Sequence, residues 1–277
     1  MLVSLKEILD IAQERKIGLG AFNTPDMAYA KAIIGAAEEL DLPVVIMHAQ
    51  IHEEMGLCTL EEIAPMMLWY AEHAKVPVCV HLDHGEDIEY VKRALELGFT
   101  SVMYDGSVLS REENIANTRY VIELAKQHGA SVEAEIGSMG AREGGGGGED
   151  SAYVYTDPDE AAAYVNATGI DALACAIGTA HGLNAKNPKL DFERLSKIRE
   201  AVSVPLVMHG GSGVSDEDFK KVIARGIAKV NYYAYMAKAG AEAINGKDYI
   251  QYHVAVQDAI AAMKENVKHA MSVFANL

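Results

Sequence analysis

The sequence contains little cysteine and no long hydrophobic run. Cys58, Cys79 and Cys175 are odd in number, far apart in the chain and not part of any C-x-x-C pair. This pattern excludes a disulfide framework and argues against a thiolate metal site. The apolar runs are short and broken by glycine, proline or charge, whereas a helix needs roughly 20 apolar residues to span a bilayer. We therefore expect no transmembrane helix.

Basic residues are also scarce. Lys and Arg number 24 against 40 for Asp and Glu, which gives a net charge of −16. A surface this acidic disfavours nucleic acid and anionic membranes as partners. The first ten residues, MLVSLKEILD, lack a basic region followed by a long apolar one. We expect no export signal and a cytoplasmic location.

Half of the residues are hydrophobic, and the length suits one large barrel domain over residues 1–277. Short β-branched runs alternate with longer helical patterns, as in βαβ units with a parallel sheet. Eight strand–helix pairs favour a (β/α)8 TIM barrel over an open doubly wound sheet. The expected strands are Ile17–Phe22, Val44–His48, Val78–Asp83, Ser101–Asp105, Ser131–Ile136, Ala172–Ile177, Leu206–His209 and Ala228–Asn231.

Helix starts are marked by capping residues between these strands. Residues 249–277 extend beyond the eighth unit and predict an additional C-terminal helix, a cover for the barrel or a subunit contact. One side of this helix carries Val256, Ile260, Met263, Val267, Met271 and Phe274. The five glycines of Gly144–Gly148 indicate a mobile loop over one face. The expected caps are Ser4-x-x-Glu7, Thr59-x-x-Glu62, Ser110-x-x-Glu113, Thr24-Pro25, Asp157-Pro158 and Ser215.

Polar side chains gather at the carboxyl ends of the strands, where barrel enzymes place their catalytic groups. Among them are three histidines, His84, His181 and His209, from three different strands. Three neutral imidazoles around an open position are a common catalytic zinc arrangement. A single histidine is more often structural, so the prediction rests on all three together. The other polar strand ends are Asn23, Asp83, Asp105, Glu133, Glu135 and Asn231.

The other histidines are less informative. His48 ends a strand at the same mouth, so His48 and His52 stay ambiguous. His81 is expected to point opposite to its strand neighbours and to pack or to form a hydrogen bond. Four histidines lie in helical patterns and are interpreted as structural: His73, His128, His253 and His269.

Several motifs together resemble the class II, zinc-dependent ketose-bisphosphate aldolases, which include fructose- and tagatose-bisphosphate aldolases. They occur in the family's order between about residues 4 and 231, nearly the whole barrel. They are GAFN ending at Asn23, HLDHG at 81–85, SVMYDGS at 101–107, SVEAEIG at 131–137, IGTAHG at 177–182, HGGSG at 209–213 and KVN at 229–231.

The resemblance implies roles for individual residues. His84, His181 and His209 would bind the catalytic Zn²⁺, and Asp105 and Glu135 match acids that hold a second or displaced metal in relatives. Asp83 would be the acid/base on the oxygen at the breaking bond, and Glu143 would handle the proton on the carbanion carbon. The resemblance also suggests a monovalent cation, Na⁺ or K⁺, at the phosphate. The residues expected to contact dihydroxyacetone phosphate are Gly182, Gly210, Gly211, Ser212 and Asn231, with Asn23 also at the substrate.

The chemistry of ketose cleavage requires these residue types. Breaking the C3–C4 bond leaves charge that spreads onto the C2 carbonyl oxygen, which a Lewis acid stabilises. The C4 hydroxyl loses its proton to a carboxylate, for which Asp83 beside a metal ligand is suited. Glu143 next to a glycine-rich loop could enter after the substrate, although a solvated loop charge explains it almost as well.

The sequence also departs from the family. Ala49 and Ala234 stand where the family commonly has hydroxyl residues that hold phosphate, and Arg142 replaces the first of two paired loop acids. Tyr232, Tyr233 and Tyr235 are either substrate contacts or barrel packing. We expect an aldolase of shifted preference, for a differently phosphorylated ketose or one lacking the C1 phosphate.

Other functions stay open at this point. A Schiff-base aldolase needs a desolvated lysine, and Lys229 could face inward, whereas Lys186 lies in a polar loop. A metal-dependent sugar-phosphate isomerase or epimerase would use the same enediolate. A non-catalytic sugar-binding protein is the remaining alternative. In each case we expect a small-molecule sugar phosphate as partner and a homo-oligomer, a dimer or a tetramer.

Overall fold

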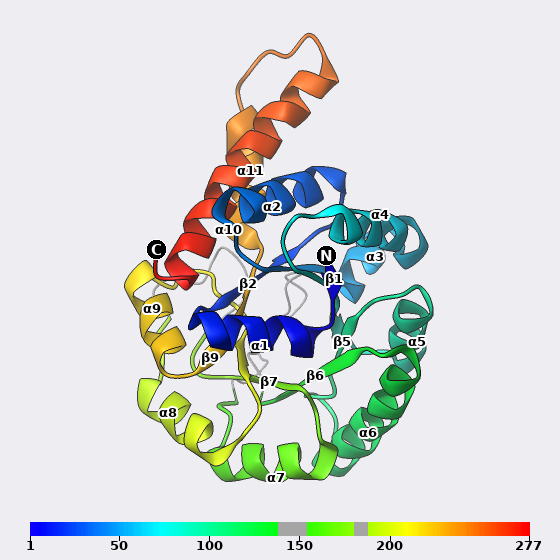
Figure 1. The fold of residues 1–277 in the computed structure, drawn as a ribbon, viewed down its shortest axis with the longest axis vertical. Coiled ribbons are helices and arrows are strands. Elements are labelled where there is room, and N and C mark those ends of the chain that lie inside the picture. The colour runs from blue at the N-terminus through cyan, green and yellow to red at the C-terminus, as the bar shows by residue number, and fades with distance from the viewer. Residues whose placement is uncertain (138–153, 180–187) are drawn as a thin grey trace.

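The computed structural model describes residues 1–137, 154–179 and 188–277. Eight parallel strands, β2 to β9, are paired in chain order, and the pairing of β9 with β2 closes them into a barrel (Figure 1). Helices lie outside between successive strands, as predicted for a (β/α)8 barrel. In the described part of the chain, no helix is both long enough and apolar enough to cross a bilayer.

The barrel strands lie where the sequence pattern predicts them, with small shifts at their ends. The first strand begins later than predicted, because Ile17 donates its N–H to Ala12 at the end of the preceding helix and Gly18 bonds to Phe274. A further strand that we did not predict, β1 (Leu2–Val3), pairs with β4. The barrel strands are β2 (Leu19–Asn23), β3 (Val44–Ala49), β4 (Val78–Gly85), β5 (Ser101–Tyr104), β6 (Ser131–Ile136), β7 (Ala172–Cys175), β8 (Leu206–Met208) and β9 (Ile227–Tyr232).

Most of the predicted helix caps are confirmed. Ser4, Thr59 and Ser110 form capping boxes, and Asp157 and Ser215 also cap their helices. The Thr24-Pro25 cap is wrong. The helices from the first to the ninth are α1 (Leu5–Arg15), α2 (Met27–Leu40), α3 (Gln50–Glu54), α4 (Leu60–His73), α5 (Ile88–Glu96), α6 (Arg111–His128), α7 (Pro158–Thr168), α8 (Phe192–Ala201) and α9 (Asp216–Ala224).

The cap of α2 is Asp26, two residues after Thr24. The Asp26 carboxylate accepts the backbone N–H groups of Ala28 and Tyr29, which gives a stronger N-cap than threonine. Thr24 instead donates its hydroxyl proton to the carbonyl of Phe22. Pro25 therefore precedes the helix.

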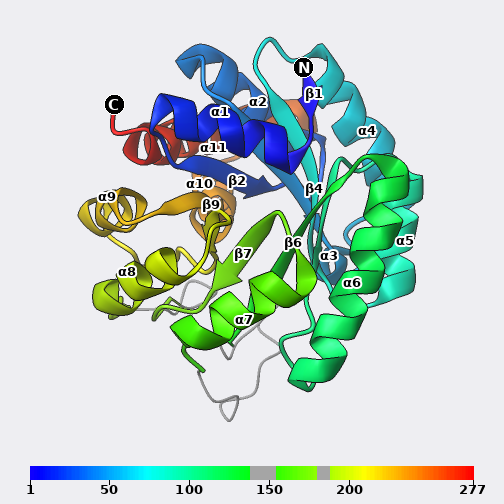
Figure 2. The same cartoon turned by 60° about the horizontal axis from the view of Figure 1, so that its bottom comes forward.

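Helix α1 lies across the amino-terminal end of the barrel (Figure 2). Its buried residues Leu5, Ile8 and Leu9 pack with the inward side chains of the strands, among them Val45 and Cys79. The N–H of Lys6 donates to the hydroxyl of Ser131 at the start of β6. This end of the barrel is therefore a packed apolar layer, and an open site is left only to the carboxyl ends of the strands.

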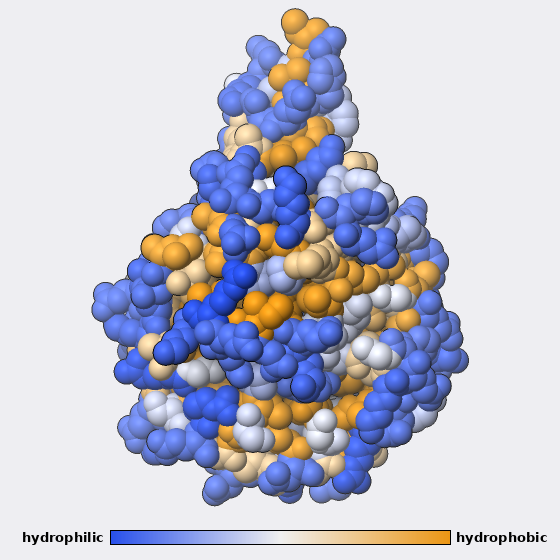
Figure 3. All heavy atoms as spheres, viewed as in Figure 1, coloured by the Kyte–Doolittle hydropathy of each residue, from blue (hydrophilic) through white to orange (hydrophobic). Residues whose placement is uncertain are grey.

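After β9 the chain forms α10 (Ala234–Ile244) and then α11 (Tyr252–Phe274), which is the helix of the predicted C-terminal extension. The second half of α11 packs on the barrel through Met263, Val267, Met271 and Phe274, which confirms the covering role. The connection between the two helices projects beyond the barrel, with hydrophobic atoms at its end (Figure 3), and Ile250 there is fully exposed.

Candidate active site and metal centre

The two-residue alternation of strands carries polar pairs into the barrel. His81 and Asp83 on β4, Glu133 and Glu135 on β6, and Lys229 and Asn231 on β9 are spaced by two, so each pair shares the inner face. All six are buried. The first member of each pair lies deeper than the second, so that the second members are closer to the mouth.

A local irregularity places Asp83 and His84 together. Neighbouring strand residues normally point to opposite faces, yet both of these side chains belong to one cluster with His209. The β4–β5 register shifts between Leu82 and Gly85, and His84 has a φ of +44°. Bulges re-aim side chains in this way next to active sites.

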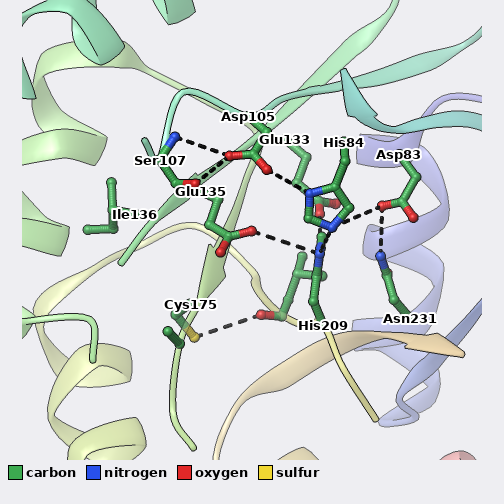
Figure 4. A network of polar contacts seen from close by, with 12 residues as sticks. Asp83, His84, Asp105, Ser107, Glu133, Glu135, Ile136, Cys175, His209 and Asn231 are labelled. Atoms are coloured by element: carbon green, nitrogen blue, oxygen red, sulfur yellow. Dashed lines mark hydrogen bonds and ion pairs between the residues drawn. The ribbon is translucent and has the colours of Figure 1, made fainter. Parts of the chain in front are cut away.

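His84 and His209 present one nitrogen each to a common point (Figure 4). His84 Nε2 and His209 Nδ1 are 2.9 Å apart. The opposite nitrogens are held by carboxylates: His84 Nδ1 lies 2.8 Å from Asp105 Oδ2, and His209 Nε2 lies 2.8 Å from Glu133 Oε1. Such carboxylate–histidine pairs fix the ring orientation of metal ligands. Asp105 is itself held by the hydroxyl of Ser107, 2.6 Å from its Oδ1.

The donor set fits a divalent cation. Two groups bring their ligand atoms within 4.8 Å of one another: Asp83 with His84 and His209, and His84 with Asp105 and Glu135. Glu135 Oε2 is buried, has no hydrogen-bond partner among the described residues and lies 3.9 Å from His209 Nδ1. Burial, with Asp105 nearby, raises the pKa of Glu135 to about 8. A cation shared by these residues would satisfy both the orphaned oxygen and the crowded charges.

The Asp83 carboxylate is clamped on both sides. Asn23 donates to its Oδ2 (3.1 Å), and Asn231 donates to its Oδ1 (2.9 Å). Burial opposes its ionisation, but His84 and His209 outweigh burial and hold the pKa of Asp83 below its usual range. Asp83 is therefore a fixed, ionised base beside the two imidazoles.

In the glycine turn after β8, neighbouring atoms approach the backbone more closely than a side chain would allow. Gly210 has a φ of +65°, and a Cβ at Gly211 would lie 3.2 Å from the Phe219 ring and 3.3 Å from the carbonyl oxygen of Asn231. The turn leads to Ser215, the N-cap of α9, and Ser212 is buried within it. It resembles the backbone anion sites at helix N-termini.

Residues that differ from the family pattern also lie around this end of the barrel. Ala49 is buried at the end of β3, level with Asp83 in the sheet register. The hydroxyl of Tyr235 accepts the N–H of Gly213 (3.1 Å), so Tyr235 touches the glycine turn. Tyr232 packs against Phe22 and Phe274 and is therefore a packing residue.

The two ambiguous histidines lie beside the site rather than in either cation group. His48 contacts the hydroxyl of Tyr90 (2.9 Å). The rings of His52 and Tyr233 are 5.6 Å apart. Burial lowers the pKa of His48 to about 3 and that of His52 to about 4, so both are neutral at pH 7. His81 forms a hydrogen bond, as predicted: its Nδ1 contacts the hydroxyl of Ser101 (2.7 Å).

Several predicted residues lie outside the described part of the chain. They are Arg142, Glu143, Gly144–Gly148, His181, Gly182 and Lys186. Of the three predicted zinc ligands, the structure thus brings together His84 and His209. Ser101 and Ser107, which orient buried polar groups, were not singled out from the sequence. Serine is too common at strand ends to give a signal there.

Comparisons with known proteins identify the family of this chain. Residues 3–276 match the family model described as fructose-bisphosphate aldolase class-II. A 6-phospho-5-dehydro-2-deoxy-D-gluconate aldolase of Halalkalibacterium halodurans is 39% identical over 99% of this chain and 96% of its own. A fructose-bisphosphate aldolase of Staphylococcus aureus is 36% identical over 99% and 97%.

Among solved structures, the YdjI aldolase of Escherichia coli K12 superposes with a TM-score of 0.86 at 34% identity, covering 99% of this chain and 97% of that one. The family model, the relatives and the solved structure therefore agree. The chain belongs to the class-II fructose-bisphosphate aldolase family and is an aldolase.

Proposed function

We propose that this aldolase is zinc-dependent and reversibly cleaves a ketose phosphate into dihydroxyacetone phosphate and an aldehyde. The observation that supports this most is the buried Asp83 carboxylate, clamped by two asparagines in one cluster with His84 and His209. Enzymes of this family are generally metal-dependent and act on sugar phosphates, and both properties suit the buried donor set and the glycine turn.

His84 Nε2 and His209 Nδ1 would hold the zinc, with His181 as the third ligand by family resemblance. The ion would act as a Lewis acid on the C2 carbonyl oxygen of the sugar. Asp105 and Glu133 keep the two rings oriented. Glu135, with Asp105, would hold a second or displaced metal.

Asp83 would accept the proton of the C4 hydroxyl as the C3–C4 bond breaks. Its low pKa keeps it ionised before the transfer, and the two amide donors hold it in place. Glu143 would protonate the C3 carbon to complete cleavage. In the synthetic direction each transfer runs in reverse.

The phosphate of dihydroxyacetone phosphate would bind at the glycine turn. Backbone N–H groups of Gly210 and Gly211 and the hydroxyl of Ser212 would face it, with Gly182 and Asn231 as further contacts and a monovalent cation as support. Asn23 would contact the substrate beside Asp83.

The substrate preference is expected to differ from that of a standard bisphosphate aldolase. Ala49 and Ala234 leave no hydroxyl at two positions where the family commonly has one. Tyr235 puts its hydroxyl on the glycine turn instead, and Tyr233 faces His52. Two hydroxyl donors to a phosphate are therefore missing, and two tyrosines lie nearby. A ketose with a different phosphate, or without the C1 phosphate, would suit them better.

We also propose a cytoplasmic homo-oligomer, a dimer or a tetramer. A groove of about 520 Å³ runs between α2, α10 and α11 and is lined by apolar residues such as Ile244, Val256 and Ile260. It lies beside exposed Ile250 of the projecting connection and exposed Tyr252 at the start of α11. Exposed apolar patches of this kind commonly mark subunit contacts. Light scattering of the wild type and an Ile250→Asp variant tests this assignment.

A substrate panel tests the proposed reaction. The purified enzyme is stripped with a chelator, reloaded with zinc and assayed on fructose-1,6-bisphosphate, tagatose-1,6-bisphosphate, ketose 1-phosphates and free ketoses. We expect zinc-dependent release of a triose and weak activity on the two bisphosphates. Interconversion of ketoses without triose release would instead indicate an isomerase or epimerase, and clear preference for the bisphosphates would refute the shifted specificity.

A further inference from the structure

Beneath the mouth of the barrel lies a charged pair whose lysine has no part in the proposed reaction. Lys229 on β9 and Glu133 on β6 are fully buried, with Lys229 Nζ 2.9 Å from Glu133 Oε2. A buried ion pair seldom adds net stability, because both ions lose their hydration. Its presence among inward residues that could have been apolar therefore calls for another role.

One arm of this pair reaches Asp83. Lys229 Nζ also donates to Asn231 Oδ1 at 2.7 Å. Because an ammonium group only donates, it selects the amide orientation in which the oxygen of Asn231 faces down and the nitrogen faces up. That nitrogen is the one that donates to Asp83 Oδ1. Lys229 thus fixes which hydrogen bond Asn231 offers to the proposed base.

The other arm reaches His209. Glu133 Oε1 lies 2.8 Å from His209 Nε2, while Glu133 Oε2 is taken by Lys229. A carboxylate only accepts, so His209 must carry a proton on Nε2. In the neutral ring, which is the form that binds a metal, Nδ1 then holds the lone pair. The same ion pair therefore contacts both Asn231, which donates to the proposed base, and His209, a proposed metal ligand.

The surroundings of the pair leave it little freedom. His81 Nε2 is 3.9 Å from Glu133 Oε2, and burial, together with the nearby Lys229 charge, lowers the pKa of His81 well below its usual range. His81 is consequently neutral, and the charge balance of this layer lies between Lys229 and Glu133. The amine of Lys229, held in an ion pair and an amide hydrogen bond, is not presented as a free nucleophile.

We propose that the Lys229–Glu133 ion pair positions two groups of the site. Lys229 orients the amide of Asn231 toward Asp83, and Glu133 orients the ring of His209 toward the metal. Lys229 is a positioning residue and does not touch the substrate. The activity readouts rest on the proposed aldolase function, whereas the metal readouts do not.

The test begins with Lys229→Met, which keeps the length of the side chain and removes its charge and its donors. Exposed Lys220→Met on α9 is the matched control. Since Lys229→Met leaves Glu133 buried and unpaired, Glu133→Gln/Lys229→Met is made in parallel so that both charges leave together. Folding is checked by circular dichroism in all variants.

The decisive measurement is a double-mutant cycle with Asn231→Ala. If Lys229 acts through Asn231, Lys229→Met lowers kcat about 10- to 100-fold, as second-shell changes typically do, with KM nearly unchanged. Combined with Asn231→Ala it then adds little further loss. Fully additive losses, or a kcat within twofold of wild type, would overturn the proposal.

The metal arm gives an independent readout. With Co²⁺ in place of zinc, the visible spectrum reports ligand geometry, and competition with a chelator reports affinity. We expect Glu133→Gln/Lys229→Met to shift the spectrum and to weaken metal affinity about 10- to 100-fold, while Lys220→Met changes neither. An unchanged spectrum and affinity would refute the role at His209. If the wild type cleaved no ketose, the proposed function would be wrong. The Co²⁺ spectrum and the metal affinity would still test the positioning role.

Borohydride reduction with each active substrate completes the test. No stable adduct is expected, because the Lys229 amine is engaged with Glu133 and Asn231. A covalent adduct on Lys229, located by mass spectrometry, would contradict the positioning role directly, since it would make this lysine a nucleophile.

Discussion

The two ends of the barrel interior are made by the same strands and have opposite chemistry. At the amino-terminal end the inward residues are apolar, such as Leu19, Val45 and Val207, and helix α1 seals them with Leu9. At the carboxyl end the inward residues are Asn23, Asp83, Glu135, His209 and Asn231. Along each strand, the inward side chains therefore change within a few residues from apolar packing residues to polar residues of the site.

The difference shows that the two ends contribute different things to the protein. The α1 end gains free energy from buried apolar area. The open end holds carboxylates close to one another, and within the described part of the chain Glu135 Oε2 has no hydrogen-bond partner. Such crowding costs stability unless a cation is bound. We therefore expect changes at the closed end to alter stability alone, and changes at the open end to alter activity or metal binding.

The largest effect is expected from metal removal. Chelation should abolish ketose cleavage, and zinc should restore it. The melting temperature should also fall, because a ligand at about 1,000 times its Kd adds about 4 kcal/mol to the free energy of unfolding. Calorimetry with and without zinc checks this. Full activity in the metal-free protein would break the assignment of the open end as a metal centre.

Asp83→Asn should give the next largest loss. It removes the base and keeps the volume, so kcat should fall about 10²- to 10⁴-fold, the usual range for a general acid/base. Zinc content, measured by atomic absorption, should stay at the wild-type level. Asp10→Asn, at an exposed position of α1, serves as the control and should keep wild-type kcat. A kcat of Asp83→Asn near wild type would assign the proton transfer elsewhere.

Leu9→Ala tests the closed end. Leu9 is buried between α1 and the strands, so the cavity should lower the free energy of unfolding by about 2–5 kcal/mol. Urea titration measures this, with exposed Gln13→Ala as the matched change on the same helix. The kcat of the folded fraction should stay unchanged. A strong loss of kcat would mean that the two ends are coupled.

The smallest effect is a pH dependence of the metal-free protein. The pKa of Glu135 is raised to about 8 from an ordinary value of 4.5, so the folded state binds its proton more tightly than the unfolded state. The stability from this group is complete below about pH 4.5 and is lost as the pH rises through about 8. The free energy of unfolding of the wild type should therefore fall relative to Glu135→Gln over this interval. Parallel curves from urea titrations at each pH would contradict this.

Local patterns in the sequence predicted most of the helices and strands. Capping boxes located the starts of α1, α4 and α6, and β-branched runs located all eight barrel strands. The misplaced cap at Thr24 shows the limit of local rules: Asp26 offered a better acceptor two residues later. Strand β1 is only two residues long and is formed by pairing with β4, so no local pattern indicated it.

The sequence by itself determined the barrel, the polar strand ends and the family motifs, because these depend on residue type and on spacings of two or three to four residues. Only the tertiary structure decided which polar residues meet. The convergence of Asp83, His84, Glu133, His209 and Asn231 depends on a bulge in β4 and on the pairing of β9 with β2, which closes the barrel. Lys229 could equally have been a nucleophile from its sequence position. Its contacts with Glu133 and Asn231 come from strands distant in the chain, and only closure of the barrel brings them within hydrogen-bond distance.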